Sequence, residues 1–421
     1  MFSAAAIVSR RHVLAAIGAL ATWYRVPAGL RAEGVADFTP EGLRTLHARA
    51  GGYEGAAPGP LLRLKHGAEL RLRLVNELPD ATAIHWHGVR IENPMDGGLM
   101  PAAVAPGASF DYRFQPPDAG TFWYHAPWRG SPASSGPARS QHLHGVLIVE
   151  EAEPPDIDRE HVLLFDDWPV AAEGKPLFQI RANGLAAPDL PVKTNERLRL
   201  RLVNAASARV LSVRIDRHVA TVMAIDGQPA QPFRARDSRV TLAPGNTADL
   251  FVDAGLEPGA VAPILLGSAG EETVLARLAY ESGPPSRPAP RPPAAALQEN
   301  PLPARLDLVH AVKVDLPTDR LASKAPHALP ALFRAKRGRT VVLGLVNRQE
   351  APCAAHVHGH VFRLLDRLDD GWKPFWLATV LVDAGQTARI AFRADIAGKW
   401  LIECVAIDRP DSVTAGWFEV A

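Results

Sequence analysis

One short hydrophobic segment recurs three times along the chain. Residues 70–76 read LRLRLVN, residues 198–204 repeat those letters, and residues 341–347 read VVLGLVN. Apolar residues at alternate positions are typical of a half-buried β-strand, and the final asparagine suits a turn. Further along each copy a glycine precedes another predicted strand. These glycines are Gly107, Gly245 and Gly385. A unit that occurs three times predicts three similar domains built from strands.

The composition also favours an all-β fold. The 421 residues include 38 prolines and 33 glycines with short Val/Leu-rich runs between them, which is typical of many short strands joined by turns. We predict three β-sandwich domains, and a Pro-rich linker before the last one. Their bounds are 36–152, 158–282 and 305–421, with the linker at 283–304. A net charge of +1 argues against a nucleic-acid partner.

The N-terminus resembles an export signal of the twin-arginine type. Arg10 and Arg11 precede an apolar stretch, residues 15–23, that is too short to span a bilayer. We therefore expect residues 1–35 to be a signal peptide and the mature protein to be periplasmic, an ordinary N-terminal helix being the alternative. No later segment is long and apolar enough to predict a transmembrane helix.

Two His-x-His pairs predict a metal site. The pairs are His85 with His87 and His356 with His358. Residues two apart on an extended segment point to the same side, so both members of a pair can reach one ion. Each pair begins nine residues after the asparagine that ends its repeat, at Asn76 and Asn347, whereas the middle repeat has Val213 and Ile215 there. The ligands should therefore come from the first and third domains.

A second spacing adds one residue from each of these domains. Eighteen residues after Gly107 lies His125, and eighteen after Gly385 lies Glu403. An imidazole and a carboxylate are both metal ligands. A further pair, His142 and His144, has two interpretations, either solvent-exposed or loop histidines, or replacement ligands for the site.

The histidine motifs resemble those of the multicopper oxidases of the laccase and copper-efflux type. The motifs that carry the resemblance are His85-Trp86-His87-Gly88, Trp123-Tyr124-His125, His356-Val357-His358-Gly359-His360, Met95-Asp96-Gly97, Asp226-Gly227-Gln228-Pro229 and residues 242–249. They span the whole mature chain. The resemblance implies three consecutive cupredoxin-like Greek-key β-sandwich domains with a copper cluster between the first and the last.

The resemblance also implies which residues hold each copper. His85 and His356 would hold a type 2 copper. One type 3 copper would take His87, His125 and position 405, and the other would take position 127, His358 and position 403. Positions 405, 127 and 403 are Val405, Pro127 and Glu403, so five of the eight cluster positions are histidines. This predicts a partial type 2/type 3-like copper site.

Two acidic residues are candidate catalytic groups in this scheme. Asp96 occupies the position of an acid that relays protons near the type 2 copper in the family, although Asp96-Gly97 is also an ordinary turn. Glu403 could offer a carboxylate oxygen to the metal. We interpreted His360 as a supporting residue rather than a ligand.

The type 1 copper site is predicted to be absent. Cys404 is present, but the two histidine positions implied by the family are Cys353 and Arg409, and a guanidinium does not bind copper. Cys353 and Cys404 are the chain's two cysteines. If the two cysteines occupy ligand positions of one lost type 1 site, their side chains lie close together. They would then form either a disulfide or a pair of thiolates that could hold a soft metal.

The sequence therefore predicts a degenerate family member, and three functions stay open. The first is an exported copper-binding protein, with or without oxidoreductase activity, acting on an unknown small molecule or metal ion. The second is a copper-free scaffold similar to the exported cell-division protein SufI, which would have a periplasmic protein partner. The third is a periplasmic protein that sequesters copper.

Overall fold

The fold is all-β, as predicted. The computed structural model describes residues 42–99, 103–127, 142–170, 177–268, 270–323, 325–365, 372–409 and 412–421. Its helical turns are the short 3₁₀ segments η1 (Asn93–Met95), η3 (Arg236–Ser238), η4 (Thr318–Arg320) and η5 (Pro326–Ala328). Within the described ranges, no helix has the length and apolar character needed to cross a membrane. The expected signal peptide, residues 1–35, lies outside the described residues.

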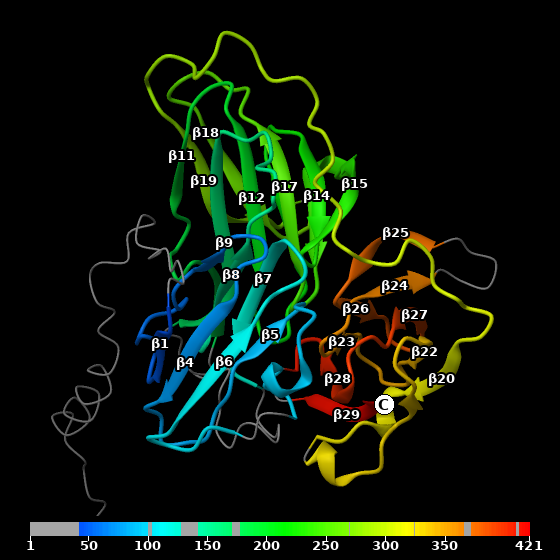
Figure 1. Ribbon diagram of the computed structural model, residues 1–421. Helices are drawn as coiled ribbons and strands as arrows, with labels where there is room; N and C mark the ends of the chain where they lie inside the picture. The colour runs from blue at the N-terminus through cyan, green and yellow to red at the C-terminus, as the bar shows by residue number, and fades with distance from the viewer. Residues whose placement is uncertain are drawn as a thin grey trace, which may run out of the picture. The chain divides into compact units, whose positions relative to one another are not determined.

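The first sandwich, drawn in blue to cyan in Figure 1, pairs two four-stranded sheets. One sheet has the order β2 (Gly52–Tyr53), β1 (Arg44–Arg49), β4 (Leu70–Asn76) and β6 (Ser109–Phe114). The other has the order β3 (Leu62–Leu64), β8 (His144–Val149), β7 (Gly120–His125) and β5 (His85–His87).

The second sandwich, drawn in green, is the largest. Its six-stranded sheet has the order β10 (Leu177–Ala182), β9 (Arg159–Val170), β12 (Arg197–Asn204), β17 (Thr247–Asp253), β14 (Ala220–Ile225) and β15 (Gln228–Arg234). Its five-stranded sheet has the order β11 (Asp189–Val192), β19 (Thr273–Tyr280), β18 (Val261–Leu266), β13 (Leu211–Ile215) and β16 (Arg239–Leu242).

The third sandwich, mostly orange to red, pairs two five-stranded sheets. One has the order β20 (Val312–Pro317), β22 (Thr340–Val346), β27 (Thr387–Arg393), β24 (Phe362–Leu365) and β25 (Trp372–Leu377). The other has the order β21 (Arg334–Ala335), β29 (Val413–Val420), β28 (Gly398–Ala406), β23 (Cys353–Val357) and β26 (Thr379–Val382). Between β19 and β20 the chain forms no strand, and Asn300 in this predicted linker donates to Gln228 of the second sandwich over 2.9 Å.

The repeated segment forms the same strand in all three sandwiches. β4, β12 and β22 each pair in parallel with the first strand of their sandwich and antiparallel with the glycine-led strand. The asparagine that follows also behaves alike. Asn76, Asn204 and Asn347 are fully buried, and the side-chain oxygen of each accepts from the backbone N–H two residues later. The predicted turn therefore has a specific cause, because each asparagine side chain replaces a backbone partner.

Strand β12 differs from the half-buried strand that its sequence predicts. All of its residues are buried, and Arg199 has no exposed surface. Arg199 Nε donates to Asp249 over 3.1 Å, and its Nη2 donates to Glu151 over 2.7 Å. Thr121 of the first sandwich donates to the other oxygen of Asp249 over 2.6 Å. The first sandwich therefore covers a face that an isolated strand would leave in solvent, and ion pairs compensate the buried charge.

Candidate metal centre

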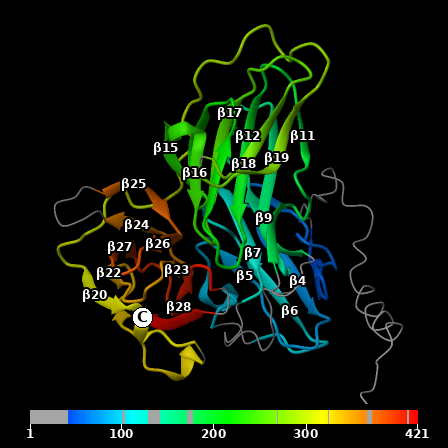
Figure 2. The same cartoon turned by 180° about the vertical axis from the view of Figure 1, so that it is seen from behind.

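Five buried histidines meet where the first sandwich contacts the third. Four of them lie on the strands β5, β7 and β23, and His358 directly follows β23. Strand β5 lies beside β23 in Figures 1 and 2. These residues are His85, His87, His125, His356 and His358. Nitrogens of the first three lie within 4.8 Å of one another, and so do those of His85 with His356 and His358. The structure thus brings together all the histidine ligands that the sequence predicts.

His85 and His356 face each other through their Nε2 atoms, which lie 3.1 Å apart. Nδ1 of His356 donates to the Ala378 carbonyl over 2.8 Å, and Nδ1 of His85 is 3.2 Å from the Asp96 carbonyl. If each Nδ1 carries the ring proton, the lone pairs of the two Nε2 atoms point at each other. This is unfavourable unless a cation lies between the two nitrogens. Two nitrogens bound at 2.0–2.1 Å to one metal ion would be about 2.9–3.4 Å apart, so the pair fits a transition metal.

His87 and His125 form the second part of the cluster. Nε2 of His125 is 3.5 Å from Nδ1 of His87, and Nδ1 of His125 donates to the Ala126 carbonyl over 2.8 Å. Thr379 of the third sandwich holds the far side of His87, with 2.8 Å between its hydroxyl and Nε2. Burial and the neighbouring histidines lower the pKa of His87 well below its usual value, so it is neutral, which is the form that binds metals.

His358 lies between two carboxylates. Its Nδ1 is 2.9 Å from Asp96 Oδ2 and its Nε2 is 3.1 Å from Glu403 Oε1. Burial alone would lower the pKa of His358, but the two carboxylates outweigh it and raise that pKa to about 10. Burial opposes ionisation of Glu403 too, yet the charge of His358 lowers its pKa to about 2. Both predicted catalytic acids therefore contact the cluster, and one ion could replace the proton between His358 and Glu403.

This arrangement makes metal binding depend on pH. Because the two carboxylates raise the pKa of His358, the metal-free chain holds a proton on it at neutral pH, and an ion bound at Nε2 must displace this proton. We expect the apparent affinity for Cu²⁺ to rise about tenfold per pH unit between pH 7 and pH 8.5. Competition with a chelator of known pH dependence measures this slope. In His358→Gln the slope should vanish, and equal wild-type affinities at the two pH values would contradict the expectation.

Asp226 of the second sandwich positions the cluster although that sandwich supplies no histidine to it. Its carboxylate accepts from the backbone N–H groups of Ala378, over 2.8 Å, and Thr379, over 3.0 Å. These are the residues that hold His356 and His87. In the sequence, Asp226 stands out only as part of the motif Asp226-Gly227-Gln228-Pro229. Its role depends on a contact between sandwiches, which spacing along the chain does not reveal.

Removing this carboxylate should loosen the cluster. We expect Asp226→Ala to weaken Cu²⁺ binding about 10- to 100-fold, as loss of a group that orients ligands usually does. Asp189→Ala is the matched control, since Asp189 is an exposed aspartate of the same sandwich. Titration of both variants with Cu²⁺ gives the comparison. An affinity in Asp226→Ala equal to that of the control would exclude the positioning role.

The residues at the position of the family's type 1 copper site differ in their exposure. Cys353 and Cys404 are buried free thiols on the paired strands β23 and β28. Arg409 is exposed. Val405 is buried, at a position where the family has a histidine ligand.

His142 lies in the turn before β8 and His144 begins that strand. Both residues are buried, so they are not solvent-exposed loop histidines. They also do not complete the five-histidine cluster at Pro127, because their ring nitrogens meet the carboxylate of Asp166 in the second sandwich. Asp166 lies far along the chain and belongs to no motif, so nothing in the sequence indicated it.

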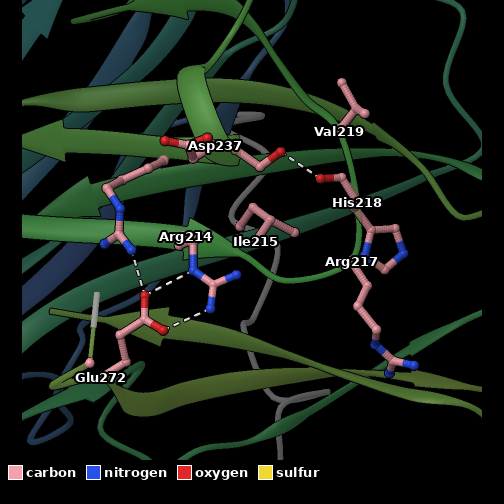
Figure 3. Close-up of a pocket in the computed structure, with 10 residues that line it drawn as sticks. Arg214, Ile215, Arg217, His218, Val219, Asp237 and Glu272 are labelled. Atoms are coloured by element: carbon pink, nitrogen blue, oxygen red, sulfur yellow. Dashed lines mark hydrogen bonds and ion pairs between the residues drawn. The ribbon is translucent and has the colours of Figure 1, made fainter. Parts of the chain in front are cut away.

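A cavity of about 630 Å³ lies elsewhere, on the second sandwich (Figure 3). Arg214 and Arg239 line it, and both donate to Glu272, at 2.8 Å and 2.5 Å. These pairs neutralise much of the local charge, and the lining holds no metal-binding cluster of the kind formed by the histidines. The histidine cluster is therefore the better candidate for the functional site.

Comparison with known proteins identifies the family of the chain. Family models described as multicopper oxidase match residues 38–154, 159–260 and 302–420. The multicopper oxidase MmcO of Mycobacterium tuberculosis is 27% identical over 84% of this chain and 79% of its own length. Copper resistance protein A of Pseudomonas syringae pv. tomato is 29% identical over 56% of this chain, and the match spans 48% of its length.

Solved structures agree with these matches. Lac15 from a marine microbial metagenome has a TM-score of 0.74 and 30% identity, covering 90% of this chain and 100% of its own. A multi-copper oxidase from Pseudomonas thermotolerans has a TM-score of 0.76 and 28% identity, covering 92% and 100%. The three matched segments, the three cupredoxin-like sandwiches and the histidine cluster between the outer two lead to one conclusion: the chain belongs to the multicopper oxidase family, whose cofactor is copper.

Proposed function

We propose that this protein is exported to the periplasm and binds copper through the five histidines between its first and third sandwiches, without a type 1 copper. The observation that carries the proposal is the pair of Nε2 atoms of His85 and His356, 3.1 Å apart and each backed by a carbonyl on Nδ1. Export is supported by the paired arginines Arg10 and Arg11 ahead of a short apolar stretch.

The residues near Cys404 support the proposed absence of a type 1 copper. That site needs two imidazoles beside the thiolate. Here a second thiol, Cys353, lies against Cys404, and Arg409 is exposed and carries no ligand lone pair. The route along which a type 1 centre would pass electrons to the cluster is also altered, because the residues flanking Cys404 are Glu403 and Val405.

Activity would therefore have to proceed at the cluster itself. Copper bound there supplies one-electron redox chemistry. Asp96 would hold a proton at Nδ1 of His358, 2.9 Å away, and its Oδ2 also accepts from the N–H of Gly98 over 3.1 Å. Glu403 would act as a carboxylate ligand or keep His358 charged when no metal is bound. The substrate class is a small molecule or a metal ion.

Copper analysis of the purified protein tests the proposal. After loading with Cu²⁺ and gel filtration, we expect copper to remain bound, with a paramagnetic Cu²⁺ signal and no intense blue absorption. An oxidase assay on the same sample decides whether the site turns over. A chain that stays metal-free after loading would contradict copper binding, and an intense blue colour would contradict the absence of a type 1 copper.

A further inference from the structure

We propose that His142, His144 and Asp166 form a second site for a divalent transition-metal ion, at the contact between the first and second sandwiches. His144 begins β8 of the first sandwich, and His142 precedes it by two residues. Asp166 lies in β9 of the second sandwich. Nothing in the five-histidine cluster uses these residues, and the site would be an addition to the proposed copper site.

The three side chains converge in a protected position. The exposed fractions of His142, His144 and Asp166 are 8%, 6% and 5%. Asp166 Oδ2 lies 2.5 Å from Nδ1 of His142 and 3.1 Å from Nε2 of His144. The other oxygen of Asp166 accepts from the N–H of Asp167 over 2.7 Å, which fixes the carboxylate with Oδ2 towards the two rings.

One ring nitrogen of the pair is poorly satisfied. Nε2 of His144 is buried and makes no hydrogen bond of acceptable geometry, although Asp166 Oδ2 is near. A buried polar atom without a partner is costly, and native structures usually satisfy it. Donors held to one ion at 2.0–2.1 Å are about 2.9–3.4 Å apart. The ligand atoms of the three residues lie within 4.8 Å of one another, and His144 Nε2 is already 3.1 Å from Asp166 Oδ2, whereas an ion would lengthen the 2.5 Å contact of His142.

The surroundings hold His142 in place. Its ring stacks on Trp168, with 4.5 Å between centroids and 16° between planes. The guanidinium of Arg181 also lies over the Trp168 ring, 5.2 Å from its centroid. His142 also has a φ of 53°, in the left-handed region that non-glycine residues seldom adopt. Such strain persists where the surrounding contacts require that side chain.

The donor set defines the class of ion. Two imidazoles and one carboxylate suit Zn²⁺, Cu²⁺ or Fe²⁺ and leave at least one coordination position for water or a substrate. His144 is the direct cross-strand partner of His125, so the two sites are neighbours on one sheet. An ion at the second site would join the first sandwich to the second, beside the copper cluster.

Zinc and cobalt titrations of the full chain test this proposal. Three variants are compared with wild type: His142→Gln with His144→Gln, His85→Gln with His356→Gln, and the control His161→Gln with His218→Gln, two histidines of the second sandwich outside both clusters. We expect the first variant to bind one Zn²⁺ fewer than wild type. The second should retain that ion and show the Co²⁺ absorption of an N/O site, and the control should match wild type.

A second variant keeps the test decisive if the double histidine variant fails to fold. Asp166→Asn preserves the shape of the carboxylate and can still accept from Asp167, but it removes the charge. We expect it to bind Zn²⁺ more than about tenfold more weakly than wild type. Zn²⁺ should also raise the melting temperature of the His85/His356 variant. Equal Zn²⁺ stoichiometry and affinity in wild type and the His142/His144 or Asp166 variants would overturn the proposal.

Discussion

Replacing His85 and His356 together by alanine should remove the copper that these two residues share. The affinity of this position for Cu²⁺ should fall by more than about 100-fold, because loss of a group that merely orients a ligand already costs about 10- to 100-fold. Their facing Nε2 atoms are 3.1 Å apart across the contact between the first and third sandwiches, so the double substitution removes one ligand from each sandwich. Copper content after gel filtration and the paramagnetic Cu²⁺ signal measure the loss.

The control for this experiment is the variant with His161 and His218 replaced. Both histidines are in the second sandwich, where they bond to the Pro191 carbonyl and the Tyr280 hydroxyl. Their loss should leave the copper content unchanged. If the His85/His356 variant kept its full copper content, the site between the first and third sandwiches would be excluded as the copper site.

Replacing Asp249 by alanine should destabilise the protein by about 3–5 kcal/mol, the usual cost of removing one partner from a buried ion pair. The change leaves the guanidinium of Arg199 without the carboxylate that it bonds through Nε and Nη2. It also removes the acceptor of the Thr121 hydroxyl, so the contact between the first and second sandwiches is weakened. Urea unfolding of wild type and variant, followed by tryptophan fluorescence, gives the difference in unfolding free energy.

The repeat offers a matched control for this variant. Asp111 occupies the same place in the first sandwich that Asp249 occupies in the second, four residues after the glycine that leads its strand. It pairs with Arg73, and about half of each side chain is exposed, so solvent screens the pair. Asp111→Ala should therefore barely change the unfolding midpoint. Equal destabilisation by the two substitutions would show that burial of the Asp249 network contributes nothing.

The sequence predicted the architecture because its main signals act over short distances. The apolar pattern of residues 70–76 and the asparagine that ends it recur with fixed spacing, and strand pairing and turns depend on such local patterns. The same reasoning placed His85 and His356 at equal positions in two copies of one fold. Spacing therefore identified the five histidines, and the resemblance to the multicopper oxidases implied that they meet between the first and last sandwiches.

Only the tertiary structure decided which distant side chains complete each site. The burial of Arg199, the hold of Asp226 on residues 378–379, and the meeting of His142 and His144 with Asp166 all arise where one sandwich covers another. A strand's sequence fixes the face on which a side chain lies, because the backbone alternates with a period of two. What lies opposite that face depends on how whole sandwiches pack, and packing joins residues that have no fixed relation along the chain.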